Sequence, residues 1–309
     1  MNPKQLKRIA IVLVVLLFFW GMAEILGGKR NDTEVGFVLP ALDASEFDGV
    51  TFATDSGTVV LTRAVDNSWM VNGFETDQAA LDELFEAVSN SAELELVATS
   101  ALVHERMGVD SVSGIRVSFV RGNETVAAAI FGKSGSEYGS RYARSAAANF
   151  VYLYTGALAN LVTRPVSGWR DKRIIDISPD SVFRVTVERS GEQYSLVRAG
   201  TEWQFETGSP TDSGAVHRML GRFQTLDASS FPEEAQLDSI DFNPPDRQVT
   251  LFNSRGDTLT SLMFDSTNAA YWVQQASGGY IYRILAWQAD QMVPADSTVR
   301  AGAEGTGNE

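Results

Sequence analysis

Cysteine is absent from this sequence of 309 residues, and histidine occurs only twice. The absence of cysteine excludes disulfide bonds, thiolate metal ligands, a thiol nucleophile and a lipid attached to a cysteine. His104 and His217 stand far apart, and neither has a second histidine or a paired carboxylate at the spacing of a metal site. No Gly-x-Ser-x-Gly segment presents a catalytic serine. The sequence therefore predicts no catalytic residue, no metal and no cofactor.

Basic residues are also scarce. The 25 Lys and Arg residues face 39 Asp and Glu residues, which gives a formal net charge of -14. No stripe of Lys and Arg reverses this charge locally, so we expect no nucleic-acid partner. The apolar fraction of 44% and the 17 Phe residues are typical of a folded protein with a core.

The longest apolar run lies at the N-terminus, where Lys4, Lys7 and Arg8 precede the segment from Ile9 to Leu26. A helix of this length reaches roughly 27 Å, close to the thickness of the hydrocarbon core of a bilayer. We therefore expect one transmembrane helix, with a cytoplasmic N-terminus and the bulk of the chain outside the inner membrane. The residues expected to contact lipid are Ile9, Val12, Leu16, Phe19, Trp20 and Leu26.

A cleaved signal peptide is the alternative interpretation of the same segment. Gly21 and Ala23 offer small residues at the two positions that a signal peptidase reads. The apolar run continues through that position and ends at Lys29 and Arg30, which favours a retained anchor.

Beyond the anchor, one pattern occurs twice at a spacing of roughly 130 residues. Each copy begins with three short strands that end at a tryptophan, Trp69 or Trp203, and continues with an amphipathic helix, 77–89 or 212–225. Two hairpins and a short helix close each copy. The expected fold class is α+β: an N-terminal transmembrane helix followed by two tandem repeats, each an antiparallel sheet with an amphipathic helix packed on one face. The expected domains are a basic leader and anchor (1–30), a first repeat (31–162), a linker (163–180), a second repeat (181–295) and a disordered tail (296–309).

The linker holds the densest group of chemically active side chains, Trp169, Arg170 and Asp171. As a functional feature, this group is a candidate partner-binding surface or a clamp for a carboxylate. As a structural feature, it is a tryptophan wedged between the repeats, with Asp171 paired to a nearby arginine.

The chain carries five short motifs: Ser68-Trp69, Met107-Gly108-Val109-Asp110, Trp169-Arg170-Asp171-Lys172, Glu202-Trp203 and Phe242-Asn243-Pro244-Pro245. Together these motifs resemble the bacterial domain-of-unknown-function family 4340 (DUF4340). The likeness spans nearly the whole chain, although Ser111 and Val112 stand where the family has prolines. Members of that family are commonly encoded beside gliding-motility-type ABC transporter genes, so the resemblance implies an accessory role without enzymatic activity.

Three functions follow from these observations. The leading hypothesis is a membrane-anchored extracytoplasmic accessory, binding or scaffolding protein without enzymatic activity, with a transporter or envelope protein as its partner. The second is an exported hydrolase that uses carboxylates such as Asp171, which only folding brings together. The third is a secreted carbohydrate-binding protein, released after Ala23, that uses exposed aromatic side chains.

Overall fold

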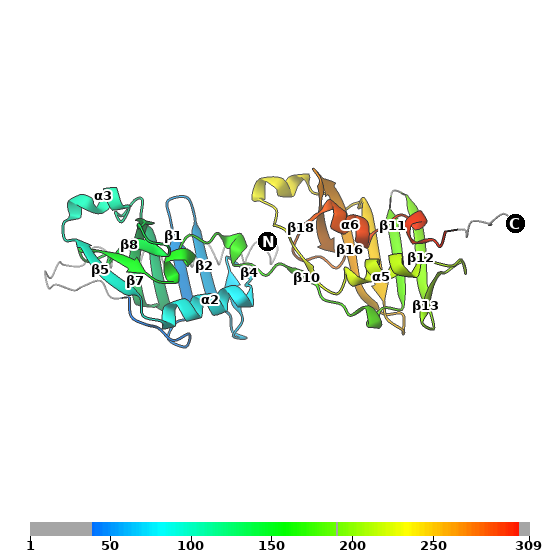
Figure 1. Ribbon diagram of the computed structural model, residues 1–309, viewed down its shortest axis with the longest axis horizontal. Coiled ribbons are helices and arrows are strands. Elements are labelled where there is room, and N and C mark those ends of the chain that lie inside the picture. Colours follow the sequence, from blue (N-terminus) through cyan, green and yellow to red (C-terminus); the bar gives the residue numbers. More distant parts are fainter. Residues whose placement is uncertain (1–38, 190, 303–309) are drawn as a thin grey trace, which may run out of the picture. The chain divides into compact units, whose positions relative to one another are not determined.

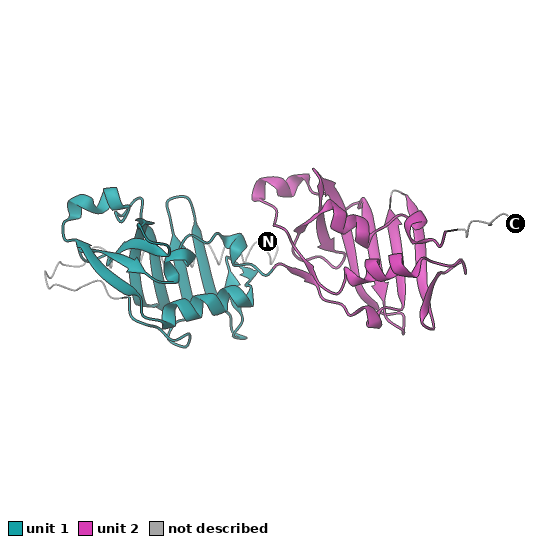
Figure 2. Cartoon of the chain, viewed as in Figure 1, with its two compact units in different colours: residues 1–171 teal, residues 172–309 magenta. Residues whose placement is uncertain are grey.

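The computed structural model describes residues 39–189 and 191–302. The chain divides into two compact units, Met1–Asp171 and Lys172–Glu309, which we call unit 1 and unit 2 (Figures 1 and 2). The division after Asp171 falls inside the stretch that the sequence suggested as a linker.

Unit 1 contains one antiparallel sheet in the order β4-β3-β2-β1-β6-β7-β8-β9-β5 (Figure 1). Its strands are β1 (Gly49–Ala53), β2 (Thr58–Arg63), β3 (Trp69–Val71), β4 (Phe74–Glu75), β5 (Glu93–Ala98), β6 (Ile115–Arg121), β7 (Glu124–Ser134), β8 (Ser140–Arg144) and β9 (Val151–Thr155). Its helices are α2 (Gln78–Ser89), η1 (Ala101–Val103), α3 (His104–Met107), α4 (Leu158–Leu161) and η2 (Val166–Gly168).

The core of unit 1 lies between one face of this sheet and α2. Alternate residues of β1, Val50 and Phe52, point into the core, as do Leu81 and Leu84 from the apolar face of α2. A smaller cluster on the other face joins Val109, Ile130 and Val151, so the segment that carries α3 packs there. The sheet is therefore covered by helices mainly on one side.

Unit 2 contains a seven-stranded antiparallel sheet in the order β13-β12-β11-β15-β16-β17-β18 and a separate pair, β10-β14. Its strands are β10 (Arg173–Ile175), β11 (Arg184–Arg189), β12 (Glu192–Ala199), β13 (Glu202–Phe205), β14 (Leu226–Asp227), β15 (Arg247–Phe252), β16 (Thr258–Thr267), β17 (Ala270–Gln275) and β18 (Tyr282–Leu285). Its helices are η3 (Pro179–Ser181), α5 (Ser213–Gly221), η4 (Glu234–Ser239), α6 (Ala286–Met292) and α7 (Asp296–Val299). Because α7 includes the fully buried Val299, unit 2 extends into the stretch expected to be a disordered tail.

The two units are built to one plan, with matching residues 134 or 135 positions apart in the first half of each. The backbone N–H of Leu42 donates to the carbonyl of Val88, and the N–H of Ile177 donates to the carbonyl of Phe223 in the same way. This internal correspondence allows any feature of one unit to be compared with its counterpart in the other.

The fold class expected from the sequence is wrong. The described residues form mostly antiparallel sheet, and no described helix is long and apolar enough to cross a membrane. The longest, α2, has 12 residues and rises about 18 Å, well short of a bilayer core of roughly 30 Å. The same finding contradicts the expected location, in which the chain passes once through the inner membrane. The suggested lipid contacts lie outside the described residues: Ile9, Val12, Leu16, Phe19, Trp20 and Leu26.

Matched aspartates begin the main helix of each unit. The Asp77 carboxylate accepts a hydrogen bond of 2.8 Å from the N–H of Ala80, and Asp212 accepts one of 2.9 Å from Ala215. Replacing either aspartate by alanine is expected to lower the free energy of unfolding of its own unit by about 1 kcal/mol. Urea denaturation followed by circular dichroism measures this loss. Asp55→Ala, in an exposed turn, is the control, and an equal loss there would contradict a capping role.

Candidate functional site

The two histidines hydrogen-bond to backbone carbonyl groups and lie in different units. Nε2 of His104 is 3.0 Å from the carbonyl oxygen of Asn149, and Nδ1 of His217 is 3.0 Å from that of Ser213, one turn earlier on α5. Among residues 39–189 and 191–302, no group of three or more His, Asp or Glu side chains is placed to hold a metal ion. The histidines therefore contribute structure at both places.

Asp110 organises the turn that follows α3. Its carboxylate accepts hydrogen bonds from the hydroxyl of Ser113 and from the N–H groups of Ser113 and Val112, the latter two at 2.9 Å and 2.8 Å. The Ser113 hydroxyl and N–H lower the pKa of Asp110 from 3.8 to about 2, because they stabilise the charged form. A carboxylate held ionised in this way is suited to fixing a turn and cannot act as a general acid near neutral pH.

The pKa of Asp110 gives a pH-dependent prediction. Since the folded state lowers this pKa, the carboxylate stabilises the turn above pH 3.8, and this stabilisation is lost as the pH falls towards 2. Ser113→Ala is expected to raise the pKa of Asp110 towards its ordinary value, whereas Ser113→Thr keeps the hydroxyl and retains the low pKa. A pH titration of the Asp110 carboxyl carbon by NMR measures both. An unchanged pKa in the alanine variant would show that the hydroxyl has no role.

Three aspartates lie close together in unit 2, near the turn between η4 and β15. Burial raises the pKa of Asp265, and the charges of Asp246 and Asp241 add to this rise. Each carboxylate nevertheless accepts a backbone hydrogen bond: Asp265 from Asp241, Asp246 from Ser266 and Asp241 from Asn243. This group therefore shapes the loop before β15.

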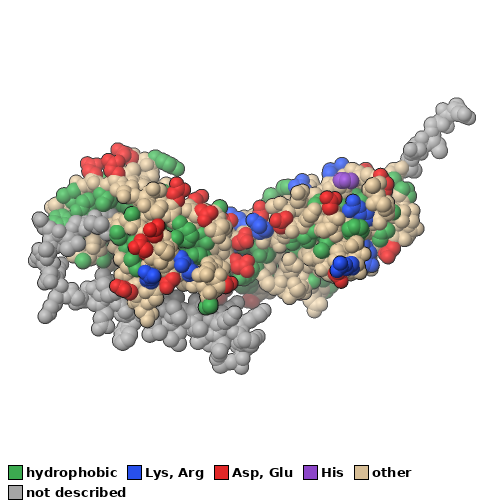
Figure 3. Space-filling view, turned by 90° about the horizontal axis from the view of Figure 1, so that it is seen from below, with side chains coloured by type: hydrophobic (Ala, Val, Ile, Leu, Met, Phe, Trp, Pro, Cys, Tyr) green, Lys and Arg blue, Asp and Glu red, His purple; other side chains and the backbone are tan. Residues whose placement is uncertain are grey.

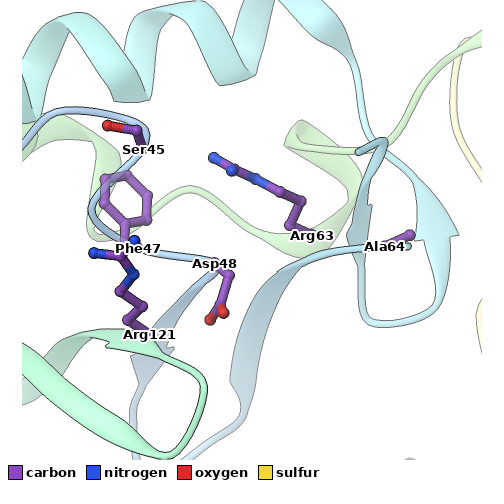
Figure 4. Close-up of a pocket in the computed structure, with 6 residues that line it drawn as sticks. All are labelled: Ser45, Phe47, Asp48, Arg63, Ala64 and Arg121. Atoms are coloured by element: carbon purple, nitrogen blue, oxygen red, sulfur yellow. The ribbon is translucent and has the colours of Figure 1, made fainter. Parts of the chain in front are cut away.

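A pocket of about 320 Å³ lies in unit 1 beside the start of β1. Figure 4 shows the side chains of Arg63 and Arg121 around it, with the carboxylate of Asp48 between the strands that carry them. Asp48 accepts the N–H of Gly122 at 2.9 Å and 3.0 Å, while Arg63 donates to the carbonyl of Ala44 and lies 5.2 Å from the ring centre of Trp69. The lining residues are Ser45, Phe47, Asp48, Arg63, Ala64 and Arg121.

The residue of unit 2 that corresponds to Arg63 shows what this arginine does. Arg198 stands 135 positions after Arg63, donates to the carbonyl of Asp180 at 3.3 Å and lies 5.4 Å from the ring centre of Phe183. Phe183 occupies the place that Asp48 has in unit 1. Because both arginines tie the loop before the first strand to the second strand, the primary role of Arg63 is structural.

The three residues proposed as a partner surface are placed mainly in the interior of unit 1. Trp169 is fully buried, Arg170 is 8% exposed, and only Asp171 presents part of its side chain to solvent. Their backbone covers the edge of β4: Asp77 donates to the Trp169 carbonyl at 2.8 Å, and Asp171 donates to that of Glu75 at 2.9 Å. The side chains therefore complete the first unit rather than meet a partner together.

The aromatic side chains considered for carbohydrate binding also pack within the units. Tyr154 is 3% exposed and its ring centre is 5.1 Å from that of Phe131, while Trp272 is 4% exposed. Tyr280 and Tyr282 lie edge to face at 6.5 Å. Tyr154 and Trp272 are therefore too buried to stack on a sugar.

Strand β5 offers a different kind of site, a sheet edge that no described segment of the chain covers. Residues 93–97 are all exposed, and large apolar side chains are among them: Leu94 at 38%, Leu96 at 52% and Val97 at 37%. In Figure 3, hydrophobic and acidic side chains gather at the end of unit 1 where Figure 1 labels β5. An exposed edge of this kind presents unpaired backbone groups to another strand.

A known protein family matches the larger part of the chain. A family model described as a domain of unknown function, DUF4340, matches residues 69–245. The chain belongs to the DUF4340 family. The DUF4340 match begins at Trp69 in unit 1 and ends in unit 2 before β15, so it spans parts of both units. It confirms the family suggested by the motifs. No curated protein and no solved structure matches this DUF4340 chain significantly.

Sequence reasoning missed β5 altogether. The segment Glu-Leu-Glu-Leu-Val-Ala alternates charged and apolar residues, which is a strand signal. Its partner β9 lies more than 50 positions further along the chain, so no local turn marks the pairing.

Proposed function

We propose that this DUF4340 chain is a non-enzymatic binding or scaffolding protein that acts by holding another protein. The observation that carries this proposal is the contrast between its ionisable side chains and its surface. The ionisable side chains hold loops and turns within each unit. The surface, in contrast, exposes hydrophobic side chains along the edge strand β5.

Several buried or half-buried arginines show how the charged groups are used. Arg144 and Arg141 both donate to backbone carbonyl groups, and Arg247 pairs with Asp290 at 2.8 Å. The single carboxylate that lines the pocket of unit 1, Asp48, is occupied by a backbone N–H. The alternative, a hydrolase with two converging acids, therefore has less support from the described residues than a binding role has.

A subunit of an ABC-type transporter is the partner to test first, because the family resemblance suggests it. The full chain, carrying an affinity tag, is expected to co-purify with the ATP-binding subunit of such a transporter. Quantitative mass spectrometry measures the enrichment against the tag alone. Absence of transporter subunits, under conditions that preserve a control complex, would contradict this choice of partner.

A further inference from the structure

The large sheets of the two units have four outer edges. Other segments of the chain cover three of these edges. In unit 1, β4 is covered by the segment around Arg170, which forms a bridge with Thr76. In unit 2, the edge beyond β13 is covered by residues 209–211, and Thr211 bridges to Arg300. Coverage of this kind is the usual protection against unwanted pairing.

The third covered edge is the counterpart of β5 itself. In unit 2, Ser230 bridges to Arg283 of β18, as β5 pairs with β9 in unit 1. This edge is short, because Pro232 follows within two residues and cannot donate to a further strand. The pair β10-β14 and the hydrogen bond from Ala228 to the carbonyl of Lys172 cover its beginning. Nothing comparable among the described residues covers β5, which runs for six residues.

The register of β5 decides which side chains a new strand would meet. Leu94 lies opposite Tyr154 and Leu96 opposite Tyr152, so both leucines share the face of the sheet that packs on the core of unit 1. Glu93 and Glu95 lie on the other face. The edge therefore has one apolar face and one acidic face.

A second copy of this chain does not fit that edge well. If two β5 strands paired antiparallel with their leucines on one face, Glu95 would oppose Glu95, or Glu93 would oppose Glu95. Like charges directly opposite one another destabilise a strand pair. A register centred on Leu96 would run the pairing through the bulge between Leu96 and Ala98.

We propose that β5 is a docking strand that binds an extended segment of a partner protein whose side chains alternate between basic and apolar. The basic side chains pair with Glu93 and Glu95, and the apolar ones cover Leu94 and Leu96. Main-chain hydrogen bonds to the edge that the described residues leave uncovered supply affinity, and the alternation supplies specificity. The net charge of -14 also attracts a basic segment. This inference rests on the proposed binding function and names its site.

The test uses the full chain and a labelled peptide of three Lys-Val repeats, with binding followed by fluorescence anisotropy. Leu96→Lys and the double variant Glu93→Lys/Glu95→Lys are each expected to weaken binding about tenfold or more, because they remove an apolar contact or reverse two charge pairs. The matched controls are Leu237→Lys, at a leucine with 41% exposure in unit 2, and Glu192→Lys/Glu234→Lys, at two exposed glutamates. Both controls are expected to bind as the unaltered chain does.

Four results would overturn the docking strand. They are no binding by the unaltered chain, equal weakening in the control variants, equal binding of a peptide methylated at every backbone nitrogen, and a dimer in sedimentation that Leu96→Lys dissociates. The last would make a second copy the occupant. Failure of the proposed function is separable: a transporter complex that persists in Leu96→Lys keeps that function and removes the docking strand. Peptide binding without a transporter complex keeps the docking strand and removes the transporter as its partner.

Discussion

Replacing Trp169 by alanine is expected to lower the free energy of unfolding of unit 1 by about 3–5 kcal/mol. The indole is fully buried and stacks on Phe52, with ring centres 5.8 Å apart and planes at 12°. Its Nε1 donates to the carbonyl of Arg164 at 3.2 Å, and the Arg164 guanidinium lies 4.8 Å from the ring centre. Truncation removes all of these contacts and leaves a cavity inside the core.

Urea denaturation with hydrogen exchange measures this effect and assigns it to a unit. The loss is expected in the exchange of α2 and β1, which share the core of Trp169, while unit 2 keeps its protection. Tyr138→Ala is the control, because that ring is 98% exposed in the same unit. Similar losses in both variants would mean that the burial of Trp169 contributes little.

Arg144→Ala is expected to lower the free energy of unfolding of unit 1 by about 2–4 kcal/mol, since it leaves the buried carbonyl of Val109 and the part-buried carbonyls of the next loop without their donor. Nε of Arg144 donates to the carbonyl of Val109 at 2.6 Å, and its Nη1 donates to the carbonyls of Ser145, Ala146 and Ala148. Burial lowers the pKa of this guanidinium, while the charge of Asp110 opposes that shift. One side chain thus holds both the segment after α3 and the loop between β8 and β9.

The same denaturation measurement tests this second loss, with exchange of the N–H of Val109 as a local reporter. This N–H donates to the carbonyl of His104 at 2.9 Å, so faster exchange there shows that the α3 segment has come away. Arg121→Ala, at an exposed arginine of β6, is the control and is expected to change stability little. An Arg144→Ala variant as stable as Arg121→Ala would rule out the bridging role.

Local signals in the sequence were enough to predict the main helix of each unit. Apolar residues recur with helical spacing in both, and an aspartate precedes each helix at the position where its carboxylate meets free N–H groups. The start of the third strand in each unit was equally predictable, because Trp69 and Trp203 each follow a turn and lie at the beginning of that strand. These features depend only on residues near one another in the chain.

Features that depend on distant partners were not predictable. Strands β10 and β14 lie about 50 residues apart and have only three and two residues, so neither carries a recognisable period. The role of Arg144 required knowing that the carbonyl of Val109, 35 positions away, lies beside it. The candidate site shares this limitation, since an open edge is defined by the strands that are missing beside it.

The junction of the two units has a consequence for digestion by proteases. Asp171 is hydrogen-bonded to unit 1 through its N–H, and the next residue, Lys172, accepts a hydrogen bond from Ala228 of unit 2. Trypsin requires an unpaired stretch of chain in its cleft, and the residues on both sides of the division are hydrogen-bonded within their own units. Arg170, Lys172 and Arg173 are therefore shielded cleavage points, which trypsin reaches only after one unit has begun to open.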